Sequence, residues 1–559
     1  MLAAFLPLVY LGIPAARGAL GIARNDDWTY YRSLFTLVET GQFQADPFAR
    51  ASMVGQLVVA APLVQVFGHN IALLQVMGAL AATLAAVVLH LVARRFLGWF
   101  PATVVTLTFA LSPVLAAIAA TFMTDLGSLI LQILAVSAGA VALRGRRLRW
   151  GWWLLAAVLG LWAFTIREYA VAAVVALGVA ALWTRWRSDP PRIVVGAIAV
   201  MLAAFGLCIA FFLWRTGLPN AGVPGRVAQG DPLFIAVQVV RAFFSLSLFV
   251  APAAALAGGR AWAFGRRHTL AAVLLTLAVA ALWWWAKFDT QGLLLVNYVS
   301  VLGPYAETLA GPPPIVFDLD AWLAVEVVSG LSALVVSLTA ASALSVGLAR
   351  GRSALGGGRL DHATTTLGHR TAVVCGIHGA MVLLVTVSAT VATDAPMFDR
   401  YLVAAVPGVS AALAYCGRGA AAWAPAARGV LRAVAVAVTC GHLVLALAIA
   451  DAAATLDGAK WELGRRTVAA GVPAVEVDAG YEWWGMHQAG AITGNHFVVD
   501  DEVSLWTSLF DDPRVCARGQ YWTPDVPAEE IIAEVSATTW FGFTHRLVAR
   551  DRQGAELCP

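Results

Sequence analysis

Long apolar runs separated by short polar turns recur along the first 450 residues of this chain. A helix needs roughly 20 apolar residues to cross the hydrocarbon core of a bilayer, so each run predicts a membrane-spanning helix. We expect thirteen spans, at residues 3–22, 70–93, 99–119, 125–143, 150–166, 169–184, 193–214, 233–257, 269–287, 322–348, 371–392, 401–416 and 431–450. The pattern predicts an α-helical polytopic membrane protein.

Two connecting segments are long enough to hold structure of their own. In the loop at 23–69, the stretch DDWTYYRSLFTLVETG has helical spacing and a stop at Gly41, and MVGQLVVAAPLVQVFG is apolar but short. Both stretches fit interfacial helices that lie along the membrane surface. The second loop, 288–321, contains GPPPIVFDLD, whose prolines exclude a continuous helix.

The chain changes character after about residue 451. DGAKWELGRRTVAAG predicts a helix, VPAVEVDAG predicts a strand that ends at Gly480, and THRLVARD at 544–551 predicts a late strand. We therefore expect a small α/β domain at 451–559 behind a membrane domain at 1–450.

Composition supports a membrane protein, because a soluble domain could not bury a chain that is 60% hydrophobic and 13% charged. Every second loop is rich in arginine: Arg94, Arg95; Arg144, Arg146, Arg147, Arg149; Arg185, Arg187, Arg192; Arg260, Arg266, Arg267; Arg350, Arg352, Arg359, Arg370; Arg418, Arg428, Arg432. Positively charged loops stay in the cytoplasm. We expect a plasma-membrane protein with its N-terminus inside and its C-terminal domain outside. These loops account for the net charge of +4, so we expect no nucleic-acid partner.

The same topology decides how the cysteines and the first run are interpreted. Cys516 and Cys558 lie in the expected outer domain, where an oxidising compartment favours a disulfide; two unpaired thiols are the alternative. The other cysteines lie in or beside spans, and we expect no metal site from cysteine or histidine spacing. If residues 3–22 were a cleaved signal peptide, Asp26 and Asp27 would still lie outside.

Ionisable residues gather at the expected outer ends of the spans. They are Asp26 and Asp27, Asp125, Arg167 and Glu168, Lys287, and Asp399 and Arg400 with Tyr401. Each has a structural alternative: Asp27 caps the next helix, Asp125 meets a helix dipole, Arg167 pairs with Glu168, Lys287 anchors the interface, and Arg400 pairs with Asp399. Ionisable groups near hydrocarbon are costly, so five such sites at one level predict a single cavity. There, a carboxylate can take a proton from an acceptor, and the basic groups can hold a phosphate.

Four short motifs add a family resemblance over residues 1–410. They are NDDWTYYRSLFTLVETGQF, APLVQVFGHNIALLQV, LSPVLAAIAATFMTDLGSL and RYLVAAVPGV. In their order and membrane side they resemble the GT-C glycosyltransferases that use polyprenyl-phosphate sugars, including the protein O-mannosyltransferases and the lipid A aminoarabinose transferase. The chain departs from the family in its Asp-Asp pair, where Asp-Glu is common, and in IREY, where relatives often carry Lys-Gly.

The resemblance implies an inverting glycosyltransferase that moves a sugar from a polyprenyl-phosphate donor to an outer protein, lipid or cell-envelope glycan. In the family an aspartate of this loop is the catalytic base, which implies Asp26 or Asp27. From their charge and membrane level we expect Arg167, Arg400 and Lys287 on the donor phosphate. We expect Asp125, Glu168, Tyr30 and Tyr401 on the substrates. No cofactor is required; a divalent cation shared by Asp26, Asp27 and Asp125 is the alternative. The alternative function is a membrane transporter or lipid flippase, which would need charged or broken-helix features near the bilayer midplane.

Overall fold

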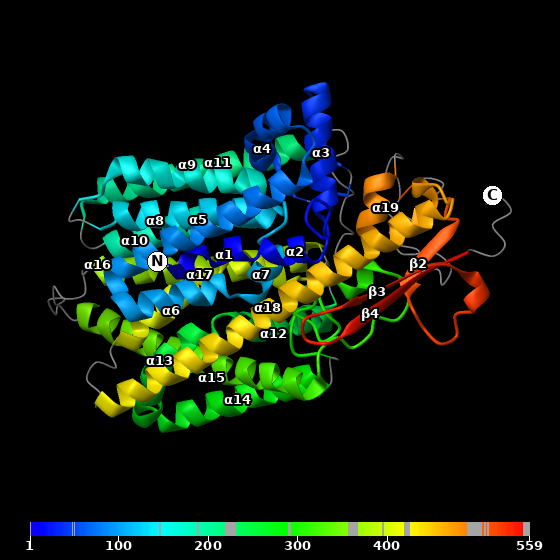
Figure 1. Cartoon of the computed structure of the whole chain (residues 1–559). Coiled ribbons are helices and arrows are strands. Elements are labelled where there is room, and N and C mark those ends of the chain that lie inside the picture. The colour runs from blue at the N-terminus through cyan, green and yellow to red at the C-terminus, as the bar shows by residue number, and fades with distance from the viewer. Residues whose placement is uncertain are drawn as a thin grey trace.

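The computed structural model describes residues 2–46, 48–49, 51–144, 147–186, 189–218, 231–288, 292–355, 367–393, 396–418, 425–488, 506–507, 510 and 514–551. Most of the predicted spans are long helices that run side by side (Figure 1): α5 (Ile71–Leu97), α8 (Thr124–Ala142), α9 (Trp150–Ile166), α10 (Val171–Arg185), α11 (Pro191–Thr216), α14 (Thr269–Phe288), α15 (Leu319–Leu355), α16 (Leu367–Thr393) and α18 (Pro425–Ala469). Within the described ranges, nine helical segments are long and apolar enough to cross a membrane; they are these helices with α12 (Pro232–Phe249) in place of the shorter α9. The chain is therefore a multi-pass, mostly helical membrane protein, as predicted.

Proline divides the remaining spans into shorter helices. They are η1 (Leu2–Phe5), α1 (Leu6–Val9) and α2 (Gly12–Ala16); α6 (Trp99–Ala110) and α7 (Pro113–Ile118); α12 (Pro232–Phe249) and α13 (Ala251–Arg267); and η5 (Asp399–Ala404) and α17 (Val406–Gly417). Proline lacks a backbone N–H and clashes with the preceding turn, so it sits best where a helix begins. Pro113, for example, opens α7. A run expected at 233–257 thus becomes two helices, and the second reaches Arg267.

Both helices expected in the loop at 23–69 are present. They are α3 (Asp27–Thr40) and α4 (Val54–Phe67). Gly41 ends α3 with φ +70°, a left-handed conformation that glycine adopts without a Cβ penalty. In Figure 1, α3 stands across the direction of the bundle helices, as a helix along a membrane surface would.

The bundle has two chemically different ends. We call the end that carries α3 and the C-terminal sheet the sheet end, and the end where α5 and α8 finish, beside the N-terminus, the arginine end (Figure 1). Arg94, Arg95 and Arg144 lie at the arginine end. The sheet end is the one that the sequence assigns to the outside.

The C-terminal part begins as a continuation of the bundle. Helix α18 runs through the expected boundary at 450/451, so the helix predicted after residue 457 is the last part of α18. A four-stranded sheet follows in the order β1-β2-β4-β3, formed by β1 (Val477–Asp478), β2 (Ala517–Tyr521), β3 (Ile531–Thr538) and β4 (Thr544–Asp551). The late strand predicted at 544–551 is β4, whereas the strand predicted before Gly480 shrinks to two residues.

The sheet packs directly on α18. Leu456 and Leu463 of α18 share a buried cluster with Tyr521 and Leu547 of the sheet and with Leu309 of the second loop. The short helix α19 (Tyr481–His487) leaves β1 and packs against α3. These contacts bring the tail next to residues 23–27.

Candidate active site

The structure separates the two adjacent acids that open α3. The side chain of Asp27 is fully buried and accepts hydrogen bonds from the backbone N–H of Arg24 (2.5 Å) and of Phe122 (3.4 Å) and from the hydroxyl of Tyr31 (3.1 Å). Burial raises the pKa of Asp27 well above its ordinary value, against the opposing effect of these hydrogen bonds and of Arg24. Asp27 therefore ties the first loop to the segment before α8, with its lone pairs already engaged.

Asp26 points into a different environment. Its Oδ2 forms an ion pair with Nη2 of Arg400, and its Oδ1 accepts a hydrogen bond from the hydroxyl of Tyr481 at 3.2 Å. The Asp26 side chain is 22% exposed, whereas that of Arg400 is 5% exposed. Of the two acids, Asp26 is the one that an incoming molecule can reach.

Arg400 does not pair with its neighbour Asp399. The Asp399 carboxylate accepts hydrogen bonds from the backbone N–H of Tyr298 (2.9 Å) and of Val299 (2.7 Å). It thereby fixes the second long loop to η5. Arg400 instead pairs with Asp26, so the alternative that Arg400 pairs with Asp399 is wrong.

A second acid–base pair lies beside the first. Nε of Arg167 lies 3.6 Å from Oδ1 of Asp125, and the hydroxyl of Tyr169 donates to the same oxygen at 2.9 Å. Asp125 is fully buried in the first turn of α8, and Arg167 ends α9. Arg167 therefore turns toward Asp125, while Glu168 accepts a hydrogen bond from Ser52 at 2.6 Å.

Aromatic rings join the two pairs. The guanidinium of Arg167 lies 5.2 Å from the centre of the Tyr401 ring, and that of Arg400 lies 5.5 Å from the same centre, within the range of a cation–π contact. Burial raises the pKa of Tyr30 to about 12, and the charges of Arg167, Asp26, Arg400 and Asp125 act on its hydroxyl. We call these residues the outer cluster: Asp26, Tyr30, Asp125, Tyr169, Arg167, Tyr298, Arg400 and Tyr401.

Several polar atoms of the outer cluster have no protein partner within the described part of the chain. They are Nε and Nη1 of Arg400 and Oδ2 of Asp125, all of them buried. Buried donors without an acceptor are costly. Two nitrogens of Arg400, Nε and Nη1, are thus available to an anionic ligand while Nη2 stays on Asp26.

One predicted phosphate ligand is placed elsewhere. Nζ of Lys287 forms an ion pair with Glu326 at 2.5 Å, between α14 and α15. No contact described in the structure joins Lys287 to the outer cluster. The sequence correctly placed Lys287 near an apolar-helix end, but a span pattern carries no information on lateral position in the bundle.

The three acids proposed for a shared cation do not converge. Among the described residues, no three His, Cys, Asp or Glu side chains form a group that could hold a metal ion. Asp27 is turned away into its three hydrogen bonds, and Asp125 faces Arg167.

Sequence reasoning missed a buried network behind Asp26. It is formed by Arg24 and Asn25 of the first loop, Tyr305 of the second loop, Asp457 and Lys460 of α18, and Glu482 of α19. Lys460 pairs with Glu482 at 2.6 Å, and both side chains are 1% exposed. The only available signal was the rarity of lysine, since Lys460 and Lys287 are the two lysines of the chain.

The predicted disulfide falls partly outside the described residues. Cys516 is disulfide-bonded, whereas Cys208, Cys375, Cys416 and Cys440 are free. Cys558 lies outside the described residues, so the pairing of Cys516 with Cys558 stays a prediction.

Comparisons with known proteins give distant structural matches. No family model matches the chain, and no curated protein matches it. Among solved structures, the chain is similar to ArnT from Cupriavidus metallidurans bound to undecaprenyl phosphate, with 13% identity, 97% of each chain covered and a TM-score of 0.36.

It is also similar to the Archaeoglobus fulgidus oligosaccharyltransferase, with 12% identity, 98% of this chain and 74% of the other covered, and a TM-score of 0.42. A further structure of that enzyme, AglB with an inhibitory peptide and a dolichol-phosphate, matches with 13% identity and a TM-score of 0.41.

Proposed function

We propose that this protein is an inverting glycosyltransferase that moves a sugar from a polyprenyl-phosphate-linked donor to an acceptor on the outer side of the plasma membrane. The observation that carries the proposal is the contact of Asp26 with Arg400, next to Arg167. It brings together a carboxylate that can accept a proton and guanidinium groups that can hold a phosphate. The level of the site, where the apolar helices end, suits a donor whose lipid tail stays in the bilayer.

The reaction needs one displacement. The hydroxyl or amine of the acceptor attacks the anomeric carbon as the bond from that carbon to the phosphate oxygen breaks, and the configuration inverts. Asp26 takes the proton of the acceptor. The polyprenyl phosphate leaves with its negative charge held by Arg400 and Arg167, in a site where buried donors are oriented in advance.

The resting ion pair is compatible with both roles. Arg400 uses Nη2 for Asp26, while Nε and Nη1 have no partner among the described residues. A phosphate bound there shares the positive charge of Arg400 and weakens its hold on Asp26. The base and the phosphate are then held by the same guanidinium group, which brings the acceptor and the donor close together, as a displacement requires.

We propose that the two arginines supply the positive charge without a cofactor. The acceptor is a protein, a lipid or a cell-envelope glycan, and the donor sugar is a hexose or a pentose. The arginine-rich loops support an orientation in which the outer cluster lies outside the cell.

The test uses the purified protein in proteoliposomes with a panel of polyprenyl-phosphate hexoses and pentoses and the three acceptor classes. We expect release of polyprenyl phosphate coupled to a product with inverted anomeric configuration by NMR, and no product with the Asp26→Asn variant. Movement of labelled lipid phosphate between leaflets without any product would instead support a flippase. Product formation that does not depend on Asp26 would contradict the mechanism.

A further inference from the structure

The first loop is held by the tail at four consecutive residues. The contacts are Trp461 Nε1 to the carbonyl of Ala23 (3.0 Å), Arg24 Nε to Asp457 Oδ2 (2.8 Å), the backbone N–H of Asn25 to Glu482 Oε1 (3.0 Å), and the Tyr481 hydroxyl to Asp26 Oδ1 (3.2 Å). We call this set the tail clamp. Its two halves are more than 430 residues apart in the sequence.

The clamped backbone needs outside support. Asn25 has φ +51°, a left-handed conformation that few non-glycine residues adopt and that asparagine tolerates best. Its backbone N–H is held by Glu482, and its side-chain amide donates to the hydroxyl of Tyr298 at 2.9 Å. Asn25 directly precedes Asp26, so these contacts fix the direction in which the Asp26 side chain leaves the backbone.

The support is itself rigid. Glu482 is paired with Lys460, and Lys460 also donates to Thr308 at 2.9 Å. The Tyr305 hydroxyl donates to Asp457 at 2.5 Å. A buried charge that loses its partner is strongly destabilising, so the members of this network hold one another in a single arrangement.

We infer that the C-terminal domain is part of the active site, in which Tyr481 and Glu482 are positioning residues for Asp26. The catalytic role of Asp26 in this inference rests on the proposed function, whereas the contacts of the tail clamp do not depend on it. Without the tail, Asp26 has neither its hydroxyl partner nor the contacts that hold the backbone beside it.

The kinetic test compares Tyr481→Phe with Tyr10→Phe. Both changes remove one buried hydroxyl, but Tyr10 donates to the carbonyl of Ala110 (2.9 Å), far from Asp26. The charged and titratable groups around Asp26 are Arg400, Arg167, Asp125, Tyr30, Tyr298 and Tyr481. Losing a donor makes a carboxylate hold its proton more tightly, so Tyr481→Phe should move the acidic limb of the pH–rate profile up by on the order of one pH unit.

We expect kcat to fall with the KM of the donor unchanged in Tyr481→Phe, and no change in Tyr10→Phe. A second readout does not need activity. Amide hydrogen exchange of the peptide spanning residues 23–27 should accelerate about tenfold in Glu482→Ala, but not in Glu462→Ala, whose side chain is exposed and pairs only within α18.

The outcomes separate the two claims. Faster exchange without any Asp26-dependent transfer would keep the clamp and remove the proposed function. Asp26-dependent transfer with an unshifted profile in Tyr481→Phe would remove the clamp. If Glu482→Ala does not fold, the profile of Tyr481→Phe decides.

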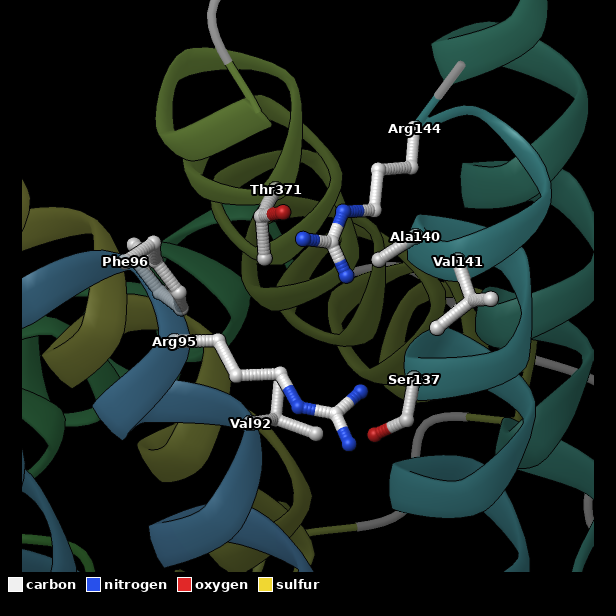
Figure 2. A pocket seen from close by; sticks show the side chains of 8 residues that line it. All are labelled: Val92, Arg95, Phe96, Ser137, Ala140, Val141, Arg144 and Thr371. Atoms are coloured by element: carbon white, nitrogen blue, oxygen red, sulfur yellow. The ribbon is translucent and has the colours of Figure 1, made fainter.

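A different observation concerns the arginine end. A small cavity there is bounded by α5, α8 and α16, and Figure 2 shows the guanidinium groups of Arg95 and Arg144 turned toward it. Its lining is Val92, Arg95, Phe96, Ser137, Ala140, Val141, Arg144 and Thr371. At about 20 Å³, it has room for a small polar group and none for an acyl chain.

The arginines of this end are not equivalent. Three of them hold helix ends: Arg185 (2.7 Å) and Arg370 (3.0 Å) donate to the carbonyl of Leu143, and Arg418 donates to that of Phe96. Arg95 and Arg144 are exposed and form no ion pair with any described carboxylate. The positive charges of Arg95 and Arg144 are therefore available to bind a ligand and are not used to stabilise the fold.

We propose that Arg95 and Arg144 bind the phosphate of an anionic glycerophospholipid from the leaflet at the arginine end. A phosphate oxygen occupies the cavity beside the Ser137 hydroxyl, the rest of the head group lies against the exposed guanidinium groups, and the acyl chains remain in the bilayer around α5 and α8. Arg95 lies in the last turn of α5, and Arg144 lies two residues after the end of α8, which is the level of lipid phosphates.

The test measures retention of phosphatidylglycerol by native mass spectrometry after titration into phosphatidylcholine nanodiscs. Each basic side chain near a phosphate contributes about 1 kcal/mol, so Arg95→Ala/Arg144→Ala should bind roughly 10- to 30-fold more weakly. The control Arg94→Ala/Arg149→Ala removes the same charge from exposed residues outside the cavity lining and should bind normally. An equal loss of phosphatidylglycerol binding in both double variants would show general surface attraction only. If glycerol 3-phosphate displaced phosphatidylglycerol at equal concentration, the site would bind free phosphate. Either result overturns the proposal.

Discussion

The two adjacent acids should respond in opposite ways to the same substitution. Asp26→Asn keeps an oxygen that can accept from Arg400 but cannot take a proton, so transfer should fall ~10²- to 10⁴-fold, the usual contribution of a general base. Folding should be affected less than by Asp27→Asn, because the Asp26 side chain is partly exposed and the amide oxygen still accepts from Arg400. Asp27→Asn should instead act on stability.

The cost of Asp27→Asn follows from its contacts. The Asp27 carboxylate receives three donors on two oxygens, and an amide offers only one acceptor oxygen. At least one donor then faces the amide NH₂ in a fully buried place. A lost buried hydrogen bond of this kind costs about 1–3 kcal/mol, a large share of the 5–15 kcal/mol typical of a folded domain.

The assay pairs the transfer reaction with thermal unfolding of the purified variants in detergent. Glu39→Gln is the matched control, since Glu39 lies on the same helix with an exposed side chain. We expect an inactive Asp26→Asn that unfolds at a higher temperature than Asp27→Asn, and a less stable Asp27→Asn that is active below its unfolding temperature. A fully active Asp26→Asn, or an inactive Asp27→Asn of normal stability, would refute the assignment of the base to Asp26.

Four further outcomes are expected. Arg167→Ala and Arg400→Ala should each weaken binding of polyprenyl phosphate about 10- to 100-fold, from charge-assisted hydrogen bonds of about 1.5–3 kcal/mol, with acceptor binding unchanged by calorimetry. A chelator should leave transfer unchanged, and activity restored by a divalent cation would contradict the arginine mechanism. Burial raises the pKa of Glu482 to about 7, so between about pH 4.5 and 7 the folded state keeps a proton that the unfolded state has lost. The free energy of unfolding should therefore fall as pH rises through this range, and it should change less with pH in Glu482→Gln. Peptide mapping without reductant should show the Cys516 and Cys558 peptides linked, and thiol labelling of both before reduction would exclude the bond.

Much of the fold follows from local patterns. Apolar runs of about 20 residues predict the spans, because a helix of about this length is needed to cross the hydrocarbon core of the bilayer. The strand at 544–551 and the stop of α3 at Gly41 were equally readable, since both depend on neighbouring residues alone. The divided spans show the limit of this reasoning: Pro113 changes helix geometry without changing hydropathy.

The outer cluster was predicted only as far as the membrane constrains it. Topology places Asp26, Asp125, Arg167 and Arg400 at one level, and the structure brings them together. Lys287 was expected near the same level yet pairs with Glu326. Lateral position depends on which helices pack together, and no periodicity in a single chain encodes that.

The tail clamp was out of reach of any local pattern, and it changes how the chain is divided. A boundary at 450/451 treats the last part of the chain as a module, because polar residues begin there. However, α18 crosses that boundary without a break, and its far end carries Asp457, Lys460 and Trp461 to the first loop. A module that only recruits an acceptor would not need buried charges fixed to the residues around Asp26. A transferase that must release Asp26 from Arg400 when the donor phosphate arrives does need them, because a carboxylate freed from its ion pair stays in place only if other contacts hold it.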